Sequence, residues 1–154
     1  MPLTAGQPAP DFDLPADNGK NIQLSRLKGR PAVVYFYPKD DTPGCTVEAI
    51  DFTRLAAEFA RAGATIIGIS PDSVADHCKF RDKHDLGIRL AADEDKAVAM
   101  AYGVWVEKKN YGKTYMGIER TTVLVDKAGL IAKVWRRVKV QGHAEKVLEA
   151  VKAL

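Results

Sequence analysis

The chain has 154 residues, of which 46% are hydrophobic and 28% charged, and its formal net charge is +3. These values are typical of an ordinary soluble globular protein that can bury a core, so we expect one domain over residues 1–154. The small charge argues against a nucleic-acid partner, no apolar run approaches the roughly 20 residues of a membrane span, and residues 1–6 lack the features of a secretory signal, so we expect a cytoplasmic protein with no membrane partner.

Strand-like and helix-like patterns alternate along the chain. Apolar and alternating runs predict strands at 11–14, 32–37, 64–70, 88–91, 121–125 and 130–135. Amphipathic periodicity predicts helices at 47–62, 73–84, 95–102 and 142–154. In the first of these helices, we expect Ile50, Leu55 and Phe59 on or near one apolar face. The segment 126–129 reads as the turn of a hairpin. This order of elements favours an α/β fold.

Cys45, one of two cysteines, lies where the strand at 32–37 gives way to a helix. Thr42 is suited to the N-cap, and Pro43 to the first helical position. A helix N-terminus presents unpaired N–H groups and the positive end of the helix dipole, and both stabilise a thiolate. The position therefore indicates a nucleophilic cysteine. The alternative is a small buried side chain that only packs.

The residues around Cys45 form a motif that extends well beyond the cysteine itself. The spacing Pro38-x3-Thr42-x2-Cys45 resembles the active-site signature of peroxiredoxins. The string at 35–49 and the segments at 110–122 and 135–144 are similar to the bacterioferritin-comigratory, or peroxiredoxin Q, group. The resemblance runs from about Ala9 to the C-terminus.

This resemblance implies a thioredoxin-like fold with a central mixed β-sheet flanked by helices. It also implies a thiol-dependent peroxidase that reduces hydrogen peroxide and organic hydroperoxides without a cofactor. Thioredoxin or a similar thiol protein would be the reductant, and the protein would be a monomer or weak dimer. Cys45 would be the peroxidatic cysteine, which attacks a peroxide oxygen and becomes a sulfenic acid.

Four further residues receive roles by the same resemblance. The hydroxyl of Thr42 would hydrogen-bond the thiolate and the peroxide, in addition to a capping role. Pro38 would shield the site from water, and it also suits the end of a strand. Arg120 would pair with the thiolate and the leaving oxygen; without the resemblance it would be a solvated strand charge. Glu48 could hold Arg120 or the loop in place, or simply favour the helix dipole.

Resolution of the sulfenic acid requires a second thiol. In many relatives it lies five residues after the peroxidatic cysteine, but that position is Ile50 here. The remaining candidate is Cys78 in the helix at 73–84, one turn before Arg81, which occupies the position expected for a resolving cysteine in that helix. On a helical wheel Cys78 lies roughly 160° from Phe80, so it points to the rim if Phe80 faces the core.

A Cys45–Cys78 disulfide needs the two Cα atoms within about 7 Å, which implies local unwinding or a bond between two chains. Otherwise Cys78 is a spectator, and the protein is a one-cysteine peroxidase that uses an external thiol. A third possibility is a non-catalytic redox sensor, which would require a slow Cys45 or an Arg120 that lies away from it.

The sequence shows few features of a metal site, a nucleotide site or a dithiol site. The three histidines show no metal-ligand spacing with the cysteines, so no metal site is expected. His77 and His84 are seven residues apart on one helix, which indicates a shared face. No dinucleotide fingerprint, phosphate loop or C-x-x-C pair occurs.

Overall fold

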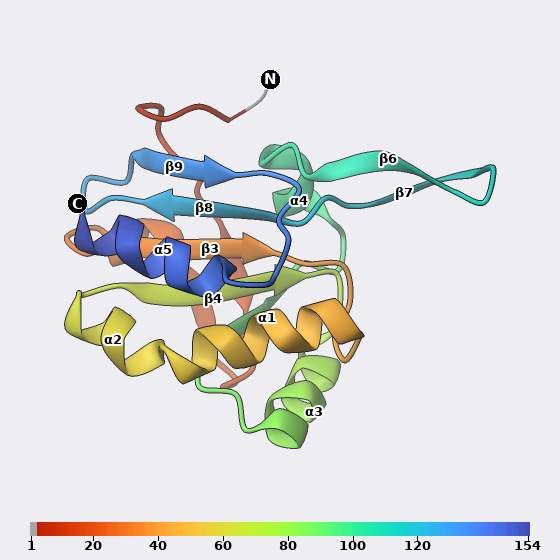
Figure 1. The fold of residues 1–154 in the computed structure, drawn as a ribbon, viewed down its shortest axis with the longest axis horizontal. Helices are drawn as coiled ribbons and strands as arrows, with labels where there is room; N and C mark the ends of the chain where they lie inside the picture. The colour runs from red at the N-terminus through yellow and green to blue at the C-terminus, as the bar shows by residue number, and fades with distance from the viewer. Residues whose placement is uncertain (1–2) are drawn as a thin grey trace.

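A five-stranded mixed sheet forms the centre of the structure, a computed structural model in which residues 3–154 are described (Figure 1). The strand order is β5-β4-β3-β8-β9. The strands are β3 (Ala32–Phe36), β4 (Thr65–Ser70), β5 (Arg89–Ala92), β8 (Thr121–Val125) and β9 (Ile131–Trp135). β3, β4 and β5 are parallel, whereas β8 pairs antiparallel with both β3 and β9. Every residue of the central strand β3 is buried, which explains its continuous apolar run.

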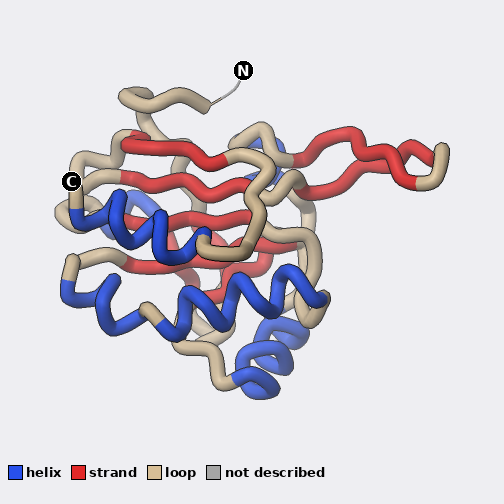
Figure 2. Tube along the Cα trace, in the orientation of Figure 1, coloured by secondary structure: helices blue, strands red, loops and turns tan. Residues whose placement is uncertain are grey.

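Successive side chains of β3 point into two separate cores. Val33 and Tyr35 pack in one core, and Val34 and Phe36 pack in the other. Helices cover the first face: α1 (Pro43–Arg54), α2 (Ala56–Arg61) and α5 (His143–Lys152), with α3 (Val74–His84) near the β5 edge (Figure 2). The second face is covered by β1 (Asp13–Pro15), β2 (Asn21–Gln23), the 3-10 helix Leu24–Leu27 and α4 (Ala97–Ala101).

A two-stranded hairpin of β6 (Trp105–Asn110) and β7 (Lys113–Ile118) projects beyond the sheet (Figure 1). The sequence analysis assigned no strands here, because most residues of the hairpin are exposed and the buried alternation typical of a strand is missing. The chain returns from this arm directly into β8. Arg120 therefore lies at the junction between the hairpin and the central sheet.

Most of the predicted elements are present, and the largest error concerns the helix predicted at 47–62. It begins earlier, at Pro43, and divides at Leu55, whose ψ of 3° interrupts the helix. The bend brings both Leu55 and Phe59 into the core. The predicted place of Ile50 on the apolar face is wrong: its side chain is 42% exposed, because the buried face consists of Cys45, Glu48, Ala49 and Phe52.

The prediction of no membrane-spanning segment rested on the absence of a long apolar run. Within residues 3–154, the helices are all too short or too polar to cross a membrane.

Candidate active site

Cys45 lies in the first turn of α1, immediately after the loop that follows β3. Thr42 is the N-cap and Pro43 begins the helix, as the sequence predicts. The carbonyl of Thr42 accepts the first helical hydrogen bond from the N–H of Thr46, at 2.8 Å. The Thr42 hydroxyl makes no capping bond; it donates to the carbonyl of Lys39 at 2.7 Å. The Cys45 side chain is 1% exposed, so the loop and helix hold it within the core rather than on the surface.

Arg120 reaches Cys45 from the start of β8, 75 positions later in the chain. Its Nη2 donates to Cys45 Sγ at 3.3 Å. Gly44 leaves room for this approach, since a Cβ atom at that position would come within 3.2 Å of the same nitrogen. A guanidinium remains charged at all relevant pH values, and it can stabilise negative charge on the sulfur or on an oxygen beside it.

Glu48 lies one turn after Cys45 and binds the other arm of the guanidinium. Arg120 Nη1 donates to Glu48 Oε1 at 2.6 Å, and the Glu48 side chain is 1% exposed. Burial raises the pKa of Glu48 to about 7, and the neighbouring Arg120 opposes this rise. Burial alone would lower the pKa of Arg120, but the charges of Glu48 and Cys45 raise it instead. The three side chains therefore form one connected charged group.

Pro38 lies at the beginning of the loop and is exposed. The N–H of the preceding Tyr37 still bonds to the carbonyl of Ile69 in the neighbouring strand. Proline has no N–H to continue the hydrogen bonds between β3 and β4, so Pro38 ends the strand. The sequence predicted this role beside the shielding role. Its shielding of Cys45 from water stays a prediction.

Cys78 has a different environment on α3. Phe80 is buried and Cys78 is half-buried, which confirms the helical-wheel prediction that Cys78 faces the rim. Its Sγ donates to the carbonyl of Asp17 at 3.2 Å, and Arg81 Nη1 donates to the same carbonyl at 2.6 Å. Both cysteines are free thiols. Each thiol has its own hydrogen-bond partner in the structure.

Comparison with known proteins agrees with this geometry. Residues 5–134 match the model of the AhpC/TSA family. The chain belongs to this family. It is 50% identical to Peroxiredoxin Bcp of Bacillus subtilis over 152 residues, which cover 99% of this chain and 97% of the relative. It is 41% identical to Peroxiredoxin Bcp of Escherichia coli over 151 residues, which cover 98% and 97%.

Solved structures of peroxiredoxins have the same fold as this family member. The Xanthomonas campestris bacterioferritin comigratory protein, described for its alkyl peroxide reduction activity, superposes with a TM-score of 0.91 at 44% identity and covers 97% of this chain and 98% of its own. Peroxidoxin BcpB of Mycobacterium tuberculosis gives 0.86 at 35% identity, with coverage of 99% and 98%. The resemblance to the peroxiredoxin Q group and the thioredoxin-like fold are thereby confirmed.

The sequence analysis missed a buried network beside the Cys45 loop of this peroxiredoxin. His77 Nδ1 lies 2.6 Å from Asp40 Oδ2, and the hydroxyl of Tyr37 donates to Asp40 Oδ1 at 2.6 Å. At the surface, His84 Nε2 lies 2.9 Å from Asp41 Oδ1. The predicted shared face of His77 and His84 is confirmed, and it packs against the two consecutive aspartates. In the sequence, the two consecutive aspartates and the two histidines on one helix were the features that could have predicted this network.

Three atoms of this network also lie close enough together to raise the question of a metal. Asp40, Asp72 and His77 bring ligand-type atoms within 4.8 Å of one another. However, His77 Nε2 lies 3.0 Å from the carbonyl of Ala91, so both ring nitrogens already face hydrogen-bond acceptors. Both nitrogens are therefore engaged in hydrogen bonds within the protein. The cluster is therefore best described as a hydrogen-bonded network.

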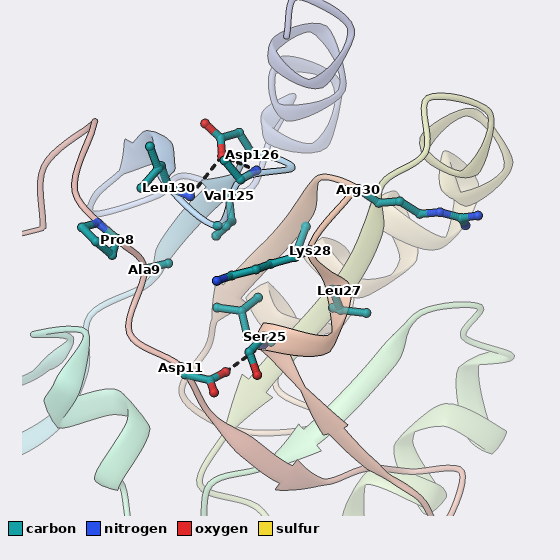
Figure 3. A pocket seen from close by; sticks show the side chains of 14 residues that line it. Pro8, Ala9, Asp11, Ser25, Leu27, Lys28, Arg30, Val125, Asp126 and Leu130 are labelled. Carbon is teal, nitrogen blue, oxygen red and sulfur yellow. Dashed lines mark hydrogen bonds between the residues drawn. The ribbon is translucent and has the colours of Figure 1, made fainter.

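A cavity outside the site lies far from Cys45. It has a volume of about 390 Å³, and the side chain of Lys28 extends across it (Figure 3). Its lining includes Ala32 and Val125, which pair at the end of the sheet opposite to the one that leads to Cys45. The cavity therefore does not include Cys45 or Arg120.

Proposed function

We propose that this protein reduces hydrogen peroxide and organic hydroperoxides with Cys45 as the peroxidatic cysteine. The thiolate attacks one peroxide oxygen, the O–O bond breaks, and Cys45 becomes a sulfenic acid. The leaving oxygen takes a proton and departs as water or an alcohol. The observation that carries this proposal is the 3.3 Å contact between Arg120 and the sulfur at a helix N-terminus. The same contact argues against one of the two conditions for a passive redox sensor, an Arg120 that lies away from Cys45; the other condition, a slow Cys45, is left to the turnover test below.

Arg120 is proposed to act twice in this step. Before the attack, its charge favours the thiolate; during the attack, it faces the negative charge that develops on the leaving oxygen. Glu48 is proposed as a positioning residue, because its bond fixes one arm of the guanidinium and leaves the other directed at the sulfur. Its oxygen Oε2 has no hydrogen-bond partner among the described residues, so its only strong bond is the one to Arg120.

Thr42 and Pro38 complete the proposed site. In the structure the Thr42 hydroxyl bonds to Lys39, so its proposed contact with peroxide requires a rotation about one side-chain torsion. That rotation is compatible with an N-cap whose helix is already held by its backbone carbonyl. Pro38 is proposed to mark the point where β3 ends and the loop begins, because proline has no N–H to continue the hydrogen bonds of the strand.

Cys78 is proposed to resolve the sulfenic acid. Its thiolate would attack the Cys45 sulfur, release water and form a disulfide, which a thiol reductant would then reduce. Because Cys78 contacts Asp17 while Cys45 contacts Arg120, this step requires local unwinding of at least one helix. An external thiol in place of Cys78 is the alternative, and it would give a one-cysteine peroxidase.

Peroxide consumption with dithiothreitol tests the catalytic proposal. Wild-type protein is expected to turn over many equivalents of hydrogen peroxide, and Cys45→Ser to show no turnover. Stoichiometric reaction of the wild type without turnover would instead support a sensor.

Intact mass after one equivalent of peroxide, without reductant, tests the role of Cys78. The wild-type monomer is expected to lose two hydrogens, and Cys78→Ser to gain one oxygen. A gain of oxygen in both proteins would overturn the assignment of Cys78. A disulfide-linked pair of chains would instead place the bond between two molecules.

Three wider features also belong to the proposal. Thioredoxin is the proposed reductant, tested by NADPH oxidation with thioredoxin and thioredoxin reductase. A monomer or weak dimer is the proposed assembly, tested by sedimentation velocity. The cytoplasm is the proposed location, because it maintains the free thiols that Cys45 and Cys78 require between turnovers; fractionation of the source cells tests it.

A further inference from the structure

His77 joins four parts of the fold at one buried point. It belongs to α3 and is 0% exposed. Its ring contacts the Cys45 loop through Asp40 and β5 through the carbonyl of Ala91. Asp40 is held in turn by Tyr37 at the end of β3, and its backbone N–H donates to Asp72 Oδ2 at 2.8 Å, in the segment after β4. The proposed mechanism uses none of these side chains.

The hydrogen bonds of His77 determine its charge. A neutral imidazole carries one N–H and can donate from only one nitrogen. Here Nδ1 faces a carboxylate oxygen at 2.6 Å and Nε2 faces a carbonyl oxygen at 3.0 Å. The other oxygen of Asp40 accepts from Tyr37, as expected of a carboxylate that only accepts. An imidazolium, with a proton on each nitrogen, satisfies both contacts while Asp40 stays ionised; a neutral ring satisfies them only if Asp40 is protonated.

The pKa of His77 agrees with this geometry. Burial alone would lower it, but the hydrogen bond and the charge of Asp40 raise it above its ordinary value, with smaller contributions from the Ala91 carbonyl and from Asp72. The titratable groups that face the ring are Asp40 from the loop, Tyr37 directly after β3 and Asp72 from the segment after β4. The ion pair is therefore intact at pH values below the raised pKa of His77, and it weakens as the pH rises through that pKa.

Each residue of the ion pair lies close in the chain to one of the two cysteines. Asp40 belongs to the loop that leads into the helix of Cys45, and His77 directly precedes Cys78. A second, exposed contact joins the same loop and helix: Asp41 binds both Lys83 and His84. Both contacts hold the Cys45 loop against α3.

We propose that the buried His77–Asp40 ion pair is a latch that holds the Cys45 loop against α3, and that its release limits the rate of disulfide formation. This inference rests on the proposed Cys45–Cys78 disulfide. After the sulfenic acid forms, the loop and the first turn of α1 must leave α3 before the two sulfurs meet. His77 and Asp40 are thus positioning residues that act on resolution, not on peroxide attack.

Asp40→Asn tests the latch with little change of shape. The amide can donate to a neutral His77, so the contact is kept while the ion pair is lost. Asp41→Asn is the matched control, because it weakens the exposed contact between the same loop and the same helix. The rate of disulfide formation after a peroxide pulse is measured by acid quench and mass, and the rate of peroxide attack is measured separately in a Cys78→Ser background.

We expect Asp40→Asn to accelerate disulfide formation by roughly fivefold or more, the change that about 1 kcal/mol produces. The rate of peroxide attack should change far less, and the fraction of Cys45 overoxidised to sulfinic acid should fall. Asp41→Asn should change neither rate by as much. In the wild type the rate should approach that of Asp40→Asn as the pH rises through the pKa of His77. Equal rates in wild type and Asp40→Asn across this pH range would overturn the latch.

A second measurement does not depend on Cys78. The ¹⁵N chemical shifts of the His77 ring distinguish an imidazolium from either neutral tautomer, and we expect the imidazolium in wild type at neutral pH. Hydrogen exchange of residues 38–46 should be faster in Asp40→Asn. A neutral ring in the wild type would overturn the ion pair. If wild type forms no disulfide, the effect on resolution is overturned with the role of Cys78, while the ring shifts still decide the ion pair.

Tyr37→Phe is a second test of the latch, for the case in which Asp40→Asn does not fold. It removes one hydrogen bond to Asp40 and leaves both charges in place. Disulfide formation should accelerate in the same direction by a smaller factor. A slower rate in this variant would contradict the latch.

Discussion

The two cysteines of this chain differ in their polar neighbours, and this difference does not follow from their solvent exposure. Cys45 is 1% exposed, yet it lies at a helix N-terminus with a guanidinium 3.3 Å from its sulfur. Cys78 is more accessible, but its thiol donates to a backbone carbonyl, which accepts a hydrogen bond only from the protonated form. Accessibility and activation are therefore separate properties. The more buried cysteine lies beside a cation, and the more accessible one lies beside a backbone acceptor.

Arg120→Met should have the largest effect on this comparison. It removes the cation beside Cys45, and we expect the second-order rate with hydrogen peroxide to fall by about 10²–10³-fold, as for loss of one donor to a developing anion. Stopped-flow fluorescence measures this rate. Lys113→Met, which removes an exposed charge from β7, is the matched control and should change the rate little. A loss below about tenfold for Arg120→Met would contradict the proposed role.

The stability of the Cys45 site should depend on pH through Glu48. Its pKa rises from 4.5 to about 7 on folding, so the native state retains a proton that the unfolded state loses between these values. Stability should therefore fall as the pH rises from 4.5 to about 7, by about 3 kcal/mol from this group. Denaturant unfolding at several pH values measures it. In Glu48→Gln this component should be absent; an identical pH profile in the variant would refute the assignment.

Glu48→Gln should also slow catalysis, by about tenfold, because the amide holds Arg120 with a weaker, uncharged bond. The measurement is the peroxide rate at a pH above 7, where Glu48 carries its charge. Asp51→Asn on the same helix is the control, since Asp51 pairs with Arg54 instead. Equal losses in the two variants would indicate a general effect of charge on α1.

Arg81→Met should give the smallest change, and it concerns the other cysteine. Arg81 and Cys78 share the carbonyl of Asp17, so loss of the arginine should loosen that segment. We expect alkylation of Cys78 by iodoacetamide to quicken about two- to threefold, in keeping with the small energies of half-exposed charged contacts. Alkylation of Cys45 should stay the same. Lys79→Met, beside Cys78 and exposed, is the comparison; a change in Cys45 rather than Cys78 would reverse the interpretation.

The parts of the fold that could be predicted are those with a strong local pattern. The fully buried β3 and the amphipathic α5 were found from apolar runs and helical periodicity, because each buries a regular set of side chains. The exposed β6–β7 hairpin was missed for lack of such a pattern. The bend at Leu55 was missed as well, since helical periodicity continues across it. The single domain over residues 1–154 stays a prediction.

The sequence by itself determined the α/β class, the helix N-terminus at Cys45 and, through its motif, the peroxiredoxin family. Local patterns suffice there, because a cap, a proline and an apolar period act over a few residues. The family resemblance implied that Arg120 pairs with Cys45 and offered Glu48 as the residue that holds it, but only the tertiary structure showed these contacts. The pair of His77 with Asp40 came from the tertiary structure alone. Periodicity shows which face of a helix is buried, but the partner on that face depends on how distant segments pack. The physical reason is that charge pairs act across space, and 37 to 75 residues of chain separate the partners of the Asp40–His77 and Cys45–Arg120 contacts.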